Sequence, residues 1–132
     1  MFMPKIDLSE QPAPVSQGPS CQALVPASVH GLPATIPGSG TVTSNLIVGD
    51  GYQKIAAGLK SSQAGSLSIL RFLDEAGTVP QTAFTPTTLS ANTAAQNNVN
   101  DGLPFASFQV QITNSSGTPA NLTNLAILLQ SQ

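Results

Sequence analysis

The residues of this chain that could act in catalysis are few and far apart in the sequence. Among 132 residues there is one histidine, His30, and one cysteine, Cys21. A catalytic imidazole needs a positioned nucleophile and an orienting carboxylate, and the proline-rich surroundings of His30 offer no rigid support for either. Cys21 has no base or cation near it in the sequence that could activate the thiol as a nucleophile. We therefore expect His30 to be a polar residue of the surface or of an interface, and Cys21 to be a free structural thiol.

The adjacent carboxylates Asp74 and Glu75 are the next candidates. On a strand, neighbouring side chains point to opposite faces, so these two cannot converge on one bond as the acid pair of a glycosidase does. We expect them to lie at a solvated strand end. Arg71 precedes them by three and four positions, and a local ion pair there would contribute little to stability if it were exposed.

Metal and cofactor sites are not predicted. One histidine and one cysteine cannot supply a structural zinc site. The carboxylates Asp50, Asp74, Glu75 and Asp101 are too scattered in the sequence for a calcium site, which usually takes several oxygen ligands at close spacing. The run Gly49-Asp50-Gly51 begins like a dinucleotide-binding loop, but Lys54 stands where the third glycine would be. The sequence therefore predicts no cofactor, no metal and no enzyme activity.

Composition excludes further classes of protein. Only 8% of the residues are charged, against roughly 25% in an ordinary soluble domain, whereas the hydrophobic fraction of 40% argues against general disorder. Four basic residues cannot form the positive stripe that nucleic-acid binding requires. No apolar run approaches the ~20 residues of a membrane span. The first ten residues contain charges and no apolar core, so we expect no secretory signal.

The charges are also unevenly placed. Residues 11–49 and 102–132 contain no Asp, Glu, Lys or Arg. A free monomer usually keeps an interspersed charged surface, whereas surfaces of Ser, Thr, Asn, Gln and Ala suit permanent assemblies, in which the desolvation of charges would be costly. This pattern favours an assembly component that forms homo-oligomers. Secreted β-rich adhesins share the same composition and remain an alternative.

The first 40 residues differ from the rest, since they hold seven of the eleven prolines. Proline fixes φ and removes a backbone donor, so neither a helix nor a central strand is expected to run through this stretch. We predict an extended Pro/Gly-rich N-terminal arm over 1–40 and a body over 41–132. A disordered tail is the competing interpretation, but apolar residues recur among the prolines, which favours an arm packed on its own body or on a partner. The predicted partner-binding residues are Leu24, Val25, Val29, Leu32 and Ile36.

From residue 41 onward the pattern is that of β-structure. Strands are expected at 41–49, 52–59, 66–74 and around 84–91, with turns at 97–98 and 100–102. A helix competes at 66–74, because Leu67, Leu70 and Leu73 also fit a three-residue spacing. Phe108, Val110 and Ile112 alternate with polar residues, and 121–130 returns after a turn at 114–117, which predicts a β-hairpin.

Six or seven strands in about 90 residues, with frequent turns, predict an all-β fold: an antiparallel β-sandwich, jelly-roll-like or immunoglobulin-like. Its aromatic core is small. Such a body is marginally stable alone, and oligomerisation would stabilise it.

Three segments resemble small structural proteins of tailed bacteriophages. They are residues 65–80 (GSLSILRFLDEAGTVP), 101–105 (DGLPF) and the turn 112–114 (ITN). This resemblance implies a virion component: a capsid decoration (cement) protein that binds the major capsid protein or other virion proteins, or else a tail, baseplate or fibre module. A carbohydrate-binding sandwich is a third possibility. It would use exposed aromatic rings, for which Tyr52 is the main candidate.

Overall fold

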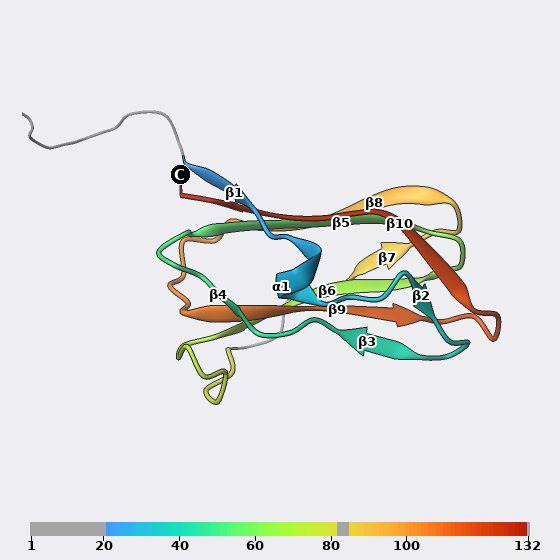
Figure 1. Cartoon of the computed structure of the whole chain (residues 1–132), viewed down its shortest axis with the longest axis horizontal. Helices are drawn as coiled ribbons and strands as arrows, with labels where there is room; N and C mark the ends of the chain where they lie inside the picture. The colour runs from blue at the N-terminus through green and yellow to red at the C-terminus, as the bar shows by residue number, and fades with distance from the viewer. Residues whose placement is uncertain (1–20, 82–84, 132) are drawn as a thin grey trace, which may run out of the picture.

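The computed structural model describes residues 21–81 and 85–131 of the chain, and its described part is the predicted β-sandwich. Two antiparallel five-stranded sheets pack face to face, with one short helix at their side (Figure 1). In the first sheet the order is β1 (Gln22–Leu24), β10 (Ala120–Gln130), β5 (Lys54–Ser61) and β8 (Thr93–Val99), and β2 (Thr35–Ile36) also pairs with β10. In the second sheet the order is β3 (Thr41–Thr43), β9 (Ser107–Asn114), β6 (Gly65–Phe72) and β7 (Thr87–Leu89), and β4 (Ile47–Val48) also pairs with β9.

Alternating side chains supply the core between the sheets. On β6, Leu67, Ile69 and Arg71 are buried, and they pair with the equally buried Ile112, Val110 and Phe108 of β9. The strand expected at 66–74 is therefore confirmed over its helical competitor. It ends two residues early, however, and Leu73 lies outside it, 56% exposed.

The described part of the predicted arm, residues 21–40, packs on the body of its own chain. β1 and β2 occupy the same edge of β10, and α1 (Ala27–His30) lies between them. The backbone N–H of Asn45 donates to the carbonyl of His30 at 2.8 Å, so α1 also contacts the corner between β3 and β4. This segment closes one side of the sandwich. The predicted boundary at residue 40 therefore falls within the sandwich, and residues 1–20 lie outside the described part.

A β-bulge in β10 changes which alternate residues of this strand face the core. Its pairing with β5 shifts by one residue between Thr123 and Ala126, and Asn124 there adopts a positive φ of 55°. The extra residue changes which side chains point inward, so that Leu122 is buried before the bulge and Ile127 and Leu129 after it.

Two details differ from the sequence expectations. β9 and β10 do not form a hairpin, because they belong to different sheets and the chain between them crosses the sandwich. Alternation shows that each strand buries one face, but both sheets offer such a face, so it cannot identify the partner strand. The turn expected at Asn97-Asn98 is wrong as well. Both residues lie in β8, where the buried Asn97 side chain donates to the carbonyl of Leu67 at 3.0 Å.

Candidate functional site

The five predicted contact residues do not form one surface. Val25 and Ile36 are 8% and 1% exposed and belong to the core of their own chain. Leu32 is half-buried against the same core. Only Leu24, on β1, and Val29, on α1, are exposed large hydrophobic residues. A partner could therefore reach Leu24 and Val29, whereas Val25 and Ile36 stabilise the sandwich itself.

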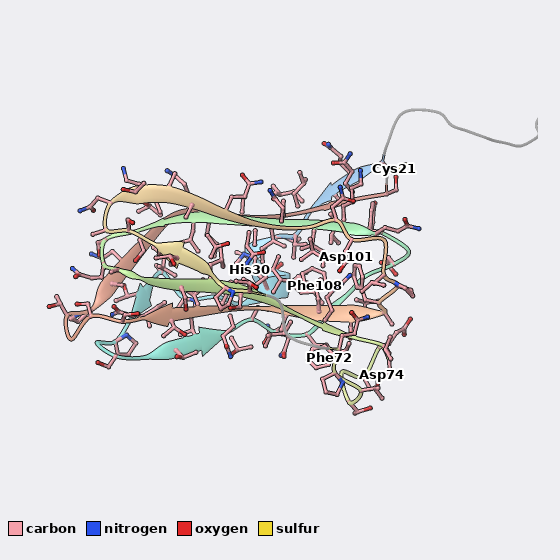
Figure 2. The ribbon with its side chains drawn as sticks, turned by 180° about the vertical axis from the view of Figure 1, so that it is seen from behind. Cys21, His30, Phe72, Asp74, Asp101 and Phe108 are labelled. Atoms are coloured by element: carbon pink, nitrogen blue, oxygen red, sulfur yellow. The ribbon has the colours of Figure 1, made fainter. Side chains whose placement is uncertain are left out.

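His30 is buried within the chain, which corrects the expected surface or interface position. Its Nδ1 accepts a hydrogen bond from the backbone N–H of Leu32 at 3.0 Å. Burial disfavours the charged imidazole and lowers its pKa below the ordinary value. The side chain lies within the sandwich in Figure 2. His30 therefore acts as a buried acceptor that fixes the turn after α1.

Cys21 is an exposed free thiol that immediately precedes β1. Its backbone N–H donates to Ser131 Oγ at 2.9 Å, which ties this position to the chain beyond β10. Within residues 21–81 and 85–131, no three His, Cys, Asp or Glu side chains come together as metal ligands. In the same residues, no helix is both long enough and apolar enough to span a membrane.

All four acidic residues of the described chain lie at one end of the sandwich: Asp50, Asp74, Glu75 and Asp101. The antiparallel register explains this placement, because β5 and β9 begin where β6 and β8 end. Three connections meet there, residues 49–53, 73–81 and 100–106, and we call them together the loop end. Figure 2 shows Asp74 and Asp101 at this same end.

Asp74 holds one of these connections in shape, and it does not lie on a strand as expected. Its carboxylate accepts the N–H groups of Thr78 and Val79, each at 2.9 Å, and the hydroxyl of Thr78. These bonds, the Thr78 hydroxyl first and the Val79 N–H next, lower the pKa of Asp74. Its carbonyl accepts the hydroxyl of Ser107 at 2.6 Å. The Asp74 carboxylate therefore stabilises this connection through hydrogen bonds to residues four and five positions later in the chain.

Arg71 and Asp101 form a pair that the sequence reasoning missed. Arg71 Nη2 lies 2.6 Å from Asp101 Oδ2, and Nη1 donates to the carbonyl of Leu103 at 3.1 Å. The guanidinium carbon is 5.3 Å from the centre of the Phe105 ring, and Phe105 meets Phe108 edge to face. Desolvation raises the pKa of Asp101, but the hydrogen bond from Arg71, the N–H of Leu103 and the charge of Arg71 together outweigh it, so the net shift is downward.

One signal for this pair was present in the sequence. Arg71 shares its parity with Leu67 and Ile69, so a strand there turns the arginine into the core. A buried guanidinium requires a carboxylate and carbonyl acceptors. The sequence did not show that Asp101, thirty residues later, would be that carboxylate.

The loop end also contains a small cavity. It has a volume of about 200 Å³ and is lined by Gly51, Tyr52, Gln53, Gly102, Leu103, Pro104 and Phe105. A wider hollow of about 350 Å³ lies on the outer face of the first sheet, over β5, β8 and β10. Its polar lining residues are Lys54, Gln96, Asn98, Asn100 and Gln130.

The outer face of the second sheet carries no charged side chain. Arg71 is the one charged residue in the strands of this sheet, and it points inward. Neighbouring polar groups partly satisfy one another: the hydroxyls of Thr41 and Thr113 lie 3.1 Å apart, and Gln111 Nε2 donates to Thr43 Oγ1 at 3.2 Å. The other polar residues of this face are Ser66, Ser68, Thr88 and Gln109. The apolar side chains of Leu70 and Phe72 on β6 and of Val48 on β4 share this face. The face is therefore neutral, with mainly hydroxyl and amide groups around a few apolar side chains.

The chain matches no protein-family model, and no curated protein is similar to it at a significant level.

Proposed function

We propose that this chain is a non-enzymatic structural protein of a virion, a capsid decoration protein that stabilises the shell by bridging its subunits. The observation that carries the proposal is the neutral outer face of the second sheet. Burying this face against a partner would desolvate hydroxyl and amide groups and no charge, and several of these groups already bond to one another. Such a face suits permanent contacts in a large assembly.

The likeness of residues 65–80, 101–105 and 112–114 to small structural proteins of tailed phages supports the same function. The mechanism is mass action. A protein that binds only the assembled shell shifts the equilibrium away from disassembly, and several linked copies around a symmetry axis add multivalency. The direct partners would be the major capsid protein or other virion proteins, and further copies of this chain.

The test compares virions that contain the protein with virions from which it has been removed. On heating or at low salt, the stripped particles should release their genome earlier, and re-addition of purified protein should restore the original transition. Release at the same temperature with and without the protein would contradict a cementing function.

A tail, baseplate or fibre module is the second candidate, since the same resemblance covers it. Copy number separates the two. A decoration protein should be present in tens to hundreds of copies per particle on a quantitative gel, and a tail module in far fewer. Carbohydrate binding depends on a single feature, the loop-end cavity with Tyr52 and Phe105, and binding of the isolated protein to a glycan array would favour it.

A further inference from the structure

The loop end and the strand end beside it hold most of the large hydrophobic residues that are exposed in the described part of the chain. Six large hydrophobic residues are exposed in the described part, and three of them lie in the loop end: Leu73 at 56%, Val79 at 46% and Leu103 at 55%. A fourth, Val48 at 40%, is the last residue of β4 and directly precedes the connection 49–53. The other two, Leu24 and Val29, are on β1 and α1. Exposed apolar side chains gathered on one part of a surface mark an interaction site.

Backbone hydrogen bonds order the segments that carry these exposed side chains. Gly49 N–H donates to the carbonyl of Ala106 at 2.8 Å, and Ala106 N–H donates to the carbonyl of Phe72 at 2.9 Å. Within the connection 73–81, the backbone N–H of Leu73 donates to the carbonyl of Val79 at 2.9 Å.

The same connections are tied to the core and to each other by side chains. Arg71 donates to the carbonyl of Leu103, the side chain of Gln81 donates to the carbonyl of Pro104, and Asp74 closes its own loop. A surface that is ordered before binding loses less conformational entropy when a partner docks.

Charge indicates the chemistry of that partner. Asp50, Glu75 and Asp101 are exposed and Asp74 is half-buried, all at the loop end. The cations on the strand ends that adjoin it are the half-buried Lys54 of β5 and Arg71 of β6, which is paired internally with Asp101. A complementary surface would place Lys or Arg around an apolar centre. The opposite end, with connections 37–40, 62–64, 90–92 and 115–119, contains no charged residue.

We propose that the loop end is the surface by which this protein docks on the assembled shell. The complementary site on the shell is then an apolar patch rimmed by basic residues. This inference rests on the proposed function. It assigns the shell contact to the end of the sandwich, so that the neutral outer face of the second sheet remains available for neighbouring copies.

The test measures binding of full-length protein to particles that lack it, by co-sedimentation over a range of salt concentrations. Leu73→Ser with Leu103→Ser should weaken binding at least roughly tenfold, because it removes two apolar contacts. Leu24→Ser, at the most exposed hydrophobic residue of the first sheet, is the matched control and should bind like wild type.

A second pair of variants tests charge. Asp50→Asn with Glu75→Gln removes two negative charges and should weaken binding severalfold and flatten its salt dependence. Asparagine is suited to the positive φ of Asp50. Ala91→Lys with Thr118→Lys makes the same change in net charge at the opposite end and should have no such effect. Thermal unfolding of every variant should match wild type, since all these side chains are exposed.

The possible failures are distinguishable. If wild type does not bind the particles, the proposed function and this docking surface both fall. If wild type binds and both loop-end variants bind equally well, the proposed function stands and this inference is overturned. If the loop-end variants lose self-association in sedimentation but keep wild-type particle binding, the occupant is a second copy, which also overturns it.

Discussion

Arg71 and Asp101 join the two sheets of the sandwich through a 2.6 Å ion pair between a fully buried guanidinium and a carboxylate that is 32% exposed. Arg71 points inward from β6 of one sheet, and Asp101 follows β8 at the edge of the other. The pair therefore holds residues 100–106 against the end of the core.

Removing the carboxylate should destabilise the fold. Asp101→Asn leaves the buried charge of Arg71 without its ionic partner, and we expect the free energy of unfolding to fall by about 2 kcal/mol, toward the lower part of the range for buried charges because Asp101 is partly exposed. Urea denaturation measures the change. Glu75→Gln, at an exposed position nearby, should stay within about 0.5 kcal/mol of wild type. Equal effects of the two variants would show that the ion pair does not stabilise the fold.

Stability should fall on mild acidification because of His30. Its folded-state pKa lies below the ordinary 6.5, so the unfolded chain binds a proton more readily. The contribution of neutral His30 to the free energy of unfolding is complete above about pH 7. It is lost as the pH falls through 6.5 toward the folded-state pKa. The free energy of unfolding should therefore decrease between about pH 7 and pH 5.

His30→Asn is the control for this pH dependence, since its side-chain oxygen can accept the N–H of Leu32 without titrating. The variant should have a flatter profile over the same range. Both proteins should lose further stability below about pH 4, where Asp74 and Asp101, whose pKa values are lowered, become protonated. An unchanged slope in His30→Asn would assign the mild-acid effect to another group.

The bulge in β10 should require a residue that accepts a positive φ. Asn124 is exposed and has a φ of 55°, so substitutions there change the backbone preference and little else. Asn124→Gly should retain wild-type stability, and Asn124→Val should cost about 1–2 kcal/mol. Thermal or urea unfolding compares the two. Equal stability of the valine and glycine variants would mean that the bulge is not strained.

Truncation should separate the two halves of the proline-rich segment. Deleting residues 1–20 removes no residue of the described sandwich, so a cooperatively folded protein is expected. Deleting residues 1–40 also removes β1, α1 and β2, together with the buried Val25 and Ile36, and uncovers one edge of β10. Each lost core side chain costs about 2–5 kcal/mol, which together approaches the whole stability of a small domain. Circular dichroism should show loss of the fold, and a wild-type unfolding transition would show that residues 21–40 are dispensable.

The sequence alone determined the fold class and most strands, because a period of two is a local property of the chain. Leu67, Ile69 and Arg71 share one parity, and so do Phe108, Val110 and Ile112, and each set is buried as that parity predicts. The turn at Asn100-Asp101-Gly102 also follows from local residue preferences, and Gly102 adopts a φ of 75° there.

The tertiary structure decided which strands pair and which side chains meet. Alternation predicted two strands around the turn at 114–117 but could not assign them to different sheets, because both sheets offer the same apolar face. Local turn preference at Asn97-Asn98 was overridden by pairing with β5 and by the bond from Asn97 to Leu67. Contacts between segments that are distant in sequence produce the burial of His30 and the ion pair between Arg71 and Asp101. Only the packing of the sheets brings such segments together.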